Sequence, residues 1–165
     1  MTDEPTRGRT RDAVTTSAVD PPEATGTPVV MTDAYVQIDT ANLSCFGMEV
    51  SIEPENKPVE IITFCGVQDF PGPTKWHLKC KFVQSFATGS VDATLSAALS
   101  AYTSAGTPAT FRVRPYKSQA VGPTNPSYEG SAIPQPYIVF GGAAGAASEV
   151  DIDWILTAPP SKVTA

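Results

Sequence analysis

The chain has 165 residues, enough for a single domain with a sizeable buried core. Apolar residues make up 41% of it, which excludes a chain that is disordered throughout, and the net charge of −6 argues against binding to a nucleic-acid backbone as the main task. Only 17% of the residues are charged, and the 12 glycines and 16 prolines favour strands, turns and extended arms over a helical bundle.

The first 30 residues have a composition unlike the rest of the chain. They contain seven threonines, four prolines and eight charged residues, but no leucine, isoleucine or aromatic residue. Such a segment buries too little apolar area to offset the entropy lost on ordering. We therefore predict an extended arm over residues 1–32, which either is disordered or becomes ordered against a neighbouring subunit.

Short strands with alternating apolar residues are predicted after the arm. Pro54 is expected to end the second of them, because proline donates no hydrogen bond to a neighbouring strand. The breaker Pro71-Gly72-Pro73 marks residues 66–74 as a loop. The strands expected in this half of the chain cover residues 34–39, 46–53, 59–64 and 76–82.

One helix is predicted, over residues 91–105. Ser90 can cap its N-terminus and Gly106 can end it. Its remaining face consists of Ala, Ser and Thr, and such small residues suit close packing on a sheet or on another subunit. The predicted apolar stripe of the helix consists of Val91, Leu95, Leu99 and Tyr102.

The second half of the chain is again predicted as strands, with a loop over residues 116–131, a flexible connection over 141–147 and a C-terminal tail over 159–165. The order of strands, helix and strands predicts a mainly β fold, an antiparallel β-sandwich or barrel with one flanking α-helix. The strands expected in this half cover residues 111–114, 133–140 and 150–156.

Few residues suit catalysis or metal binding. His77 is the only histidine, and we interpret it as a surface residue. Cys45, Cys65 and Cys80 are too few and too widely spaced for a disulfide framework, so we interpret them as small buried side chains of a reducing compartment. His77 and Cys80 are three residues apart on one strand and point to opposite faces. We expect no catalytic residue, no cofactor and no metal.

Charged side chains form stripes on the predicted strands. Glu49 with Glu53, and Asp151 with Asp153, form an acidic face, which is most simply the solvated side of half-buried strands. A basic stripe is either part of a mixed surface or a contact with such acidic faces on a neighbouring copy, as in ring-forming assemblies. The residues of this stripe are Lys75, Lys79, Lys81, Arg112 and Arg114.

Nothing in the sequence predicts a membrane segment or a leader. No stretch reaches the 18 apolar residues of a membrane helix, and Met1-Thr2-Asp3-Glu4-Pro5 lacks a basic region followed by an apolar run. We expect the protein to stay in the cytoplasm where it is made, or to join a particle assembled there.

Several short segments occur in a distinctive order between residues 33 and 158. They are Asn42-Leu43-Ser44, Glu53-Pro54, Val59-Glu60-Ile61-Ile62-Thr63-Phe64-Cys65-Gly66, the 76–82 strand, the helix ending Ala105-Gly106, Phe111-Arg112-Val113-Arg114-Pro115, Thr124-Asn125-Pro126-Ser127-Tyr128-Glu129-Gly130 and the 150–156 strand. In this order and spacing the chain resembles the tail tube (major tail) proteins of long-tailed bacteriophages, especially those of actinobacterial hosts.

The resemblance implies a β-sandwich domain over residues 33–158 with one flanking helix. It implies that six copies form a ring, whose inner strands close into a β-barrel around a lumen, and that stacked rings form the tube through which DNA leaves the head. An acidic lumen would repel DNA and let it slide without specific binding. The implied partners are further copies, a tail terminator and a tape measure protein, in a virion made in the host cytoplasm.

The resemblance also assigns the subunit contacts. Residues 53–75 correspond to the family's projecting loop, which touches neighbouring subunits. The candidate interface residues are Glu53, Val59, Ile61, Phe64, Phe70, Trp76, Tyr102 and Tyr128.

Three other functions stay open at this point. The arm is long and the domain short for the family, which leaves room for a capsid decoration protein of the same fold, bound to the major capsid protein by its arm. A head–tail connector component is a further choice within the virion. A small β-barrel that binds a ligand is the alternative from another class, and an enzyme comes last.

Overall fold

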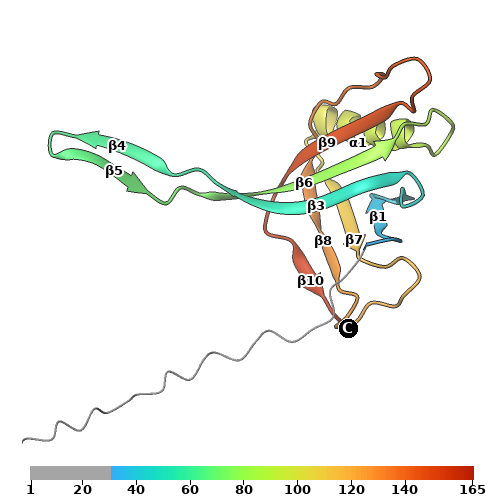
Figure 1. Cartoon of the computed structure of the whole chain (residues 1–165), viewed down its shortest axis with the longest axis horizontal. Coiled ribbons are helices and arrows are strands. Elements are labelled where there is room, and N and C mark those ends of the chain that lie inside the picture. The colour runs from blue at the N-terminus through green and yellow to red at the C-terminus, as the bar shows by residue number, and fades with distance from the viewer. Residues whose placement is uncertain (1–30) are drawn as a thin grey trace, which may run out of the picture.

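A computed structural model describes residues 31–165, so the predicted arm lies almost wholly outside the described residues. The described part is mainly β, with antiparallel strand pairs and a single helix, which confirms the predicted fold class. The elements are β1 Tyr35–Ile38, β2 Ala41–Asn42, β3 Gly47–Asn56, β4 Val59–Thr63, β5 Gly66–Phe70, β6 Thr74–Val83, α1 Val91–Ala105, β7 Ala109–Arg114, β8 Ser127–Ile133, β9 Glu149–Leu156 and β10 Ser161–Val163 (Figure 1).

One eight-stranded sheet forms the domain. Its strand order is β2-β1-β7-β8-β9-β6-β3, and β10 pairs with β8 beside this path. In Figure 1, β3, β6 and β9 run across the direction of β7 and β8, so the two halves of the curved sheet form two layers. Alternate residues of both layers point inward because successive side chains of a strand face opposite sides. The core therefore lies between the two halves of one sheet.

The core confirms most of the predicted alternation. Val36 and Ile38 of β1 are buried, as are the inward residues of β6, β7 and β9. These are Leu78, Cys80, Phe82, Phe111, Val113, Val150, Ile152, Trp154 and Leu156.

The helix has the predicted bounds and caps. The Ser90 hydroxyl accepts a hydrogen bond from the backbone N–H of Ala93 at 3.3 Å. Gly106 adopts a left-handed conformation with φ 66° and donates its N–H to the Tyr102 carbonyl at 2.8 Å, so the helix ends there. Val91 and Leu95 are buried as predicted, and Ala98 is the third buried residue of the helix.

The strand β3 is longer than predicted. It continues through Pro54 to Asn56, and Pro54 lies opposite Trp76 of β6. Proline is tolerated here because, among the described strands, β3 pairs only with β6 and forms an edge of the sheet. Near its start, a register shift between Gly47 and Glu49 turns Met48 outward, where it is 55% exposed.

Four further expectations about strands and loops were wrong. The expected loop over 66–74 contains β5, the expected loop over 116–131 contains most of β8, and the expected tail contains β10. Residues 134–140, which were expected to form a strand, lie outside any strand, and β8 ends at Ile133. The reason is that Pro134 and Pro136 have no backbone N–H to donate to a neighbouring strand. The described chain thus has ten strands rather than the six or seven expected.

Candidate assembly surface

The segment expected to be a projecting loop is an ordered β-ribbon. The strands β3 and β6 leave the domain side by side and lead into the hairpin of β4 and β5, which points away from the sheet (Figure 1). At the hairpin turn, the Thr63 hydroxyl donates to the Gly66 carbonyl at 2.8 Å, and Gly66 has φ 125°. Paired backbones thus give the projection a definite shape.

The hairpin exposes large apolar side chains. All ten residues of β4 and β5 are exposed, and the exposed fraction of their large apolar residues ranges from 46% at Ile61 and Phe70 to 78% at Ile62. Phe64, in the turn between the strands, is 113% exposed. An isolated two-stranded hairpin is marginally stable in water, and contiguous exposed apolar patches mark interaction sites. The exposed residues are Val59, Ile61, Ile62, Phe64, Val67 and Phe70.

The two faces of the hairpin differ. Val59 lies opposite Phe70, and with Ile61 these residues make one face mostly apolar, with Gln68 opposite Ile61. The other face carries Glu60 directly opposite Asp69, and like charges at such a position destabilise a strand pair. The exposed pair Ile62 and Val67 lies beside them on the same face. A surface that covers this hairpin therefore has to be mostly apolar on one side, and on the other side it has to accept two carboxylates next to an apolar pair.

The base of the hairpin is tightly packed. A side-chain carbon added at Gly72 would collide with the Lys57 carbonyl oxygen. The Lys57 ammonium also lies 3.2 Å from the Glu55 carboxylate on the outgoing strand. The two strands can approach each other at this point only because residue 72 has no side chain.

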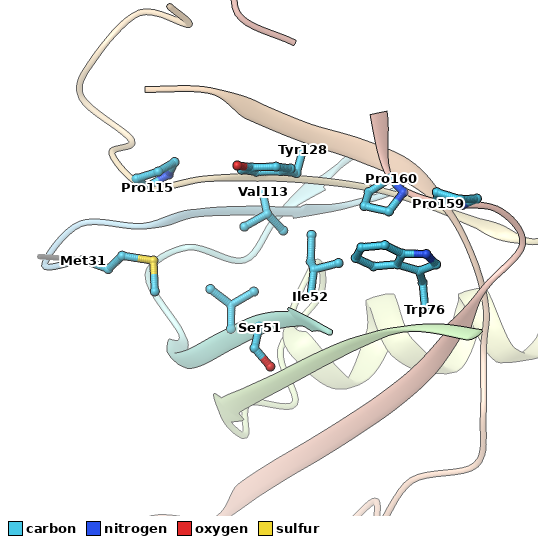
Figure 2. Close-up of a pocket in the computed structure, with 10 residues that line it drawn as sticks. Met31, Ser51, Ile52, Trp76, Val113, Pro115, Tyr128, Pro159 and Pro160 are labelled. Atoms are coloured by element: carbon cyan, nitrogen blue, oxygen red, sulfur yellow. The ribbon is translucent and has the colours of Figure 1, made fainter. Parts of the chain in front are cut away.

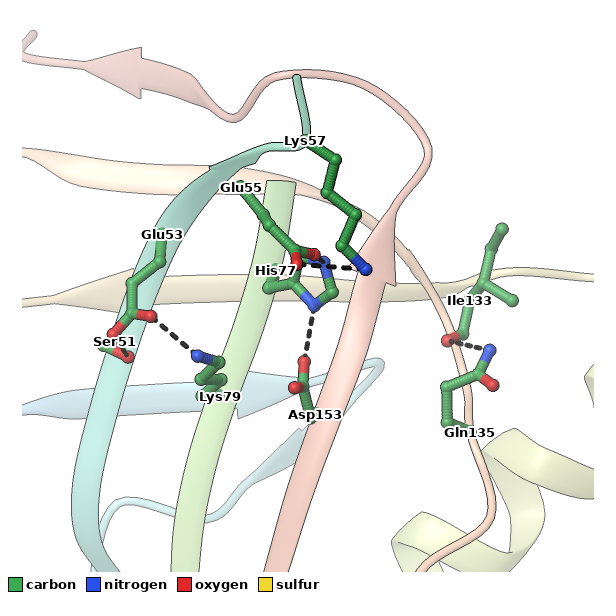
Figure 3. Close-up of polar contacts among 9 residues, drawn as sticks. All are labelled: Ser51, Glu53, Glu55, Lys57, His77, Lys79, Ile133, Gln135 and Asp153. Carbon is green, nitrogen blue, oxygen red and sulfur yellow. Dashed lines mark hydrogen bonds and ion pairs between the residues drawn. The ribbon is translucent and has the colours of Figure 1, made fainter. Parts of the chain in front are cut away.

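A polar face covers β3, β6 and β9 next to the hairpin (Figure 3). The Lys79 ammonium lies 2.7 Å from Glu53, and the Lys81 ammonium lies 2.6 Å from Glu149. On the other layer, the Arg112 guanidinium lies 2.8 Å from Glu129. The predicted basic stripe is therefore paired, at these three residues, with carboxylates of its own chain.

His77 lies between carboxylates of both neighbouring strands. Its Nδ1 is 2.7 Å from Asp153, and its Nε2 is 3.0 Å from Glu55, within ion-pair distance but outside hydrogen-bond geometry (Figure 3). It lies on the predicted polar face of its strand, but neighbouring carboxylates cover it, so that its side chain is only 14% exposed. Since carboxylates occupy both ring nitrogens, neither is directed at a nucleophile.

These contacts shift the pKa values of the exposed groups. The hydrogen bond from Lys79, assisted by that from Ser51, lowers the pKa of Glu53 below its ordinary value. The same contact raises the pKa of Lys79, and Glu149 raises the pKa of Lys81 in the same way. All of these groups are solvent-exposed, so the contacts orient the face more than they stabilise the fold.

The four residues of the predicted acidic face come together on this surface. Glu49 and Glu53 from β3, and Asp151 and Asp153 from β9, line one shallow hollow with Lys79 and Lys81 of β6 between them. Glu49 pairs in register with Lys81, and Lys81 with Asp151. The lysines of β6 thus lie between the carboxylates of β3 and those of β9. The sequence pattern of each strand did not indicate this arrangement, because it does not show which strands are neighbours.

An apolar groove of about 390 Å³ opens beside the edge of β3 (Figure 2). This apolar groove is lined by Met31, Val50, Ser51, Ile52, Trp76, Val113, Pro115, Tyr128, Pro159 and Pro160. Of the predicted interface residues, it contains the half-buried Trp76 and Tyr128. Tyr102 is half-buried on the helix, away from both the hairpin and this groove.

A second apolar patch was not expected from the sequence. Phe86, Ile138, Val139 and Phe140 are all more than half exposed, and the rings of Phe86 and Phe140 are 6.5 Å apart. Phe86 follows the end of β6 that is opposite to the hairpin. The sequence predicts residues 133–140 as a strand, so the exposure of Ile138, Val139 and Phe140 was not expected.

The cysteines differ in their surroundings. Cys80 is buried as expected, but Cys45 and Cys65 are exposed, and Cys65 lies in the turn of the hairpin. Among residues 31–165, no group of three or more His, Cys, Asp or Glu side chains is arranged to hold a metal ion. Within the same range, no helix is long and apolar enough to cross a membrane.

Solved structures with the same fold come from tubes and tail particles. A chain in a cryo-EM structure of an extracellular contractile injection system, the sheath–tube complex in its extended state, is 11% identical over 84% of this chain and 93% of that chain, with a TM-score of 0.57. A chain of the anti-feeding prophage cap, described as the tube-terminating cap, is 14% identical over 88% and 97%, with a TM-score of 0.56.

A third similar structure comes from a virion-like particle. A chain in the virion of a native gene transfer agent is 12% identical over 80% of this chain and 96% of that chain, with a TM-score of 0.51. No protein-family model matches the sequence, and no curated protein sequence matches it. The chain thus shares the fold of subunits from tube and tail assemblies, nearly over the full length of those subunits.

Proposed function

We propose that this protein is a tail tube subunit of a long-tailed bacteriophage of the actinobacterial type, with a structural and no catalytic role. Copies associate into six-membered rings, and the rings stack into a conduit through which DNA passes without specific binding. The observation that carries the proposal is the projecting hairpin, whose apolar face finds no cover within the described domain.

The fold supports this function. The similar structures are components of a sheath–tube complex, a tube-terminating cap and a gene transfer agent virion, all of them repeating or capping assemblies. The same comparison supports a place in the virion tail. The partners we propose there are further copies, a tail terminator and a tape measure protein. Synthesis then takes place in the host cytoplasm, before assembly.

The hairpin supports contacts between copies. Because β3 and β6 carry it away from the sheet, the surface that covers Val59, Ile61 and Phe70 belongs to another molecule. A hairpin of one copy that packs on a different surface of the next makes a heterologous contact, and such contacts close into rings. Ring closure also covers the part of the β3 edge that lies towards the hairpin, which otherwise is a site for aggregation.

The polar face of β3, β6 and β9 suits the lumen. It combines three lysines and His77 with a larger number of carboxylates, so it is negative overall. A negative wall repels the DNA backbone and holds no fixed contact with it. The six carboxylates are those of Glu49, Glu53, Glu55, Glu149, Asp151 and Asp153.

Assembly of the purified protein tests this proposal. Light scattering and negative-stain microscopy at high protein concentration should show rings or hollow tubes. The variants Ile61→Asp and Phe70→Asp should remain monomeric but folded, because both residues are exposed and outside the core. Ala144→Asp is the control, since it adds the same charge at an exposed residue outside both exposed apolar patches, and it should assemble normally.

Other outcomes point to other functions. A monomer or trimer that never polymerises but binds empty capsids would identify a decoration protein and overturn the tube. A monomer that ignores capsids would favour the small ligand-binding module. Assembly that is unaffected in both hairpin variants would show that the hairpin is not the contact.

A further inference from the structure

The apolar groove lies between the two layers of the domain and is open to solvent. Val50 and Ile52 from β3 and Trp76 from β6 form one wall, and Val113 and Tyr128 from β7 and β8 form the other (Figure 2). All five side chains are apolar or aromatic, and Trp76 is only half-buried. Such a groove leaves apolar side chains in contact with water unless a peptide segment or another molecule covers it.

The groove is bordered by an unpaired strand edge. Val50, Ser51 and Ile52 are consecutive, so the groove touches the edge of β3 and not only one of its faces. Among the described strands, β3 pairs only with β6, and its other edge presents backbone N–H and C=O groups. A ligand for this groove is therefore an extended peptide with small apolar side chains.

The chain itself supplies such a peptide at the right place. The described residues begin at Met31, which lines the groove and is 53% exposed. Figure 2 shows Met31 and Pro115 at one end of the groove, and Trp76 with Pro159 and Pro160 at the other. The residues directly before Met31 are Thr27-Pro28-Val29-Val30.

The composition of this short segment fits the groove. Residues 24–30 carry no charge, and Val29-Val30 is the only pair of adjacent large aliphatic residues in the first 30 residues. Pro28 disfavours a helical conformation at Thr27, and β-branched valines favour extended backbone. Seven extended residues span roughly 23 Å, enough to follow a groove that starts at Met31.

We propose that residues 24–30 lie along the apolar groove of their own chain, with Val29 and Val30 against Ile52, Trp76 and Val113. The covalent link to Met31 favours the same copy over a second one, because a short tether gives a high effective concentration. This segment closes the groove and fixes where residues 1–23 leave the domain. The inference does not depend on the proposed function.

Fluorescence quenching of the full-length chain tests the inference. Trp154 is fully buried, so quenching by acrylamide reports mainly on Trp76 in the groove. The double variant Val29→Asp/Val30→Asp should raise the quenching constant and shift the emission to longer wavelength. The double variant Val14→Asp/Val19→Asp is the matched control, since it adds the same charges elsewhere in the first 30 residues, and it should behave like the parent chain.

The same measurement separates the possible occupants. Protection of Trp76 that is constant over a wide range of protein concentration supports the inference. Equal quenching in the parent chain and in Val29→Asp/Val30→Asp would overturn it. Protection that appears only at high concentration and is lost in Ile61→Asp would also overturn it, and would identify the hairpin of a second copy as the occupant. Thermal unfolding of each variant confirms that it is folded.

Discussion

The ammonium nitrogen of Lys79 lies 2.7 Å from Oε2 of Glu53, and this contact joins β6 to the edge strand β3. It lowers the pKa of Glu53, so the contact stabilises the fold above the unfolded-state pKa of Glu53 and is lost as the pH falls through the lower, folded-state value. Lys79→Gln should raise the pKa of Glu53 back toward its ordinary value, as measured by NMR titration of the side-chain carboxyl.

The control for this titration is Lys81→Gln. Lys81 contacts Glu149 and does not touch Glu53, so its replacement should leave the pKa of Glu53 unchanged. A pKa of Glu53 that is the same in the parent chain and in Lys79→Gln would show that the two side chains do not meet in solution.

The cysteines should differ in reactivity. Burial raises the pKa of the Cys80 thiol to about 12, so this residue stays protonated and out of reach at neutral pH. In the folded protein, a thiol reagent such as Ellman's reagent should label Cys45 and Cys65, and the third thiol should react only in denaturant. Labelling of all three at the same rate in the folded protein would contradict the buried position of Cys80.

The Gly72→Ala variant should move the hairpin without changing its apolar residues. The added methyl group collides with the Lys57 carbonyl, so the two strands at the base have to separate. We expect weaker assembly in light scattering, together with an unchanged unfolding midpoint of the domain. Gly122→Ala is the matched control, because nothing lies within 4 Å of a methyl group added there. Normal assembly of Gly72→Ala would mean that the orientation of the hairpin is not critical.

The helix is expected to be an integral part of the core. Leu95 is fully buried in the same cluster as the inward residues of β6 and β9. Leu95→Ala should lower the free energy of unfolding by about 2–5 kcal/mol, because it removes buried methyl groups and leaves a cavity. Urea denaturation measures this change. The exposed neighbour Ser96 offers the control, since Ser96→Ala should change stability by less than about 0.5 kcal/mol.

Elements with a local signal could be predicted from the sequence. The alternation in residues 76–82 and 150–156 marks strands with one buried face, and it holds in β6 and β9. The helix was predicted with its bounds, because Ser90 and Gly106 act on the backbone within one turn of it. These signals need no knowledge of what lies across the core.

Elements that depend on distant partners could not be predicted. All residues of β5 are exposed, so no alternation marks it, and its strand conformation comes from pairing with β4. In β8, Gly130 weakens the strand pattern, yet it is needed because a methyl group there would press on the Phe111 ring. The strand β10 exists through its pairing with β8, more than 30 residues earlier in the chain.

The candidate surface shows the same division. By itself, the sequence determined which apolar residues lie between positions 53 and 75, among them Ile61, Phe64 and Phe70. The tertiary structure decided that they are exposed on a ribbon and that Lys79 contacts Glu53 of its own chain. The physical reason is that burial and ion pairing depend on which strands become neighbours. These neighbours are often far apart in the sequence, and their pairing depends on how all strands of the sheet pack together.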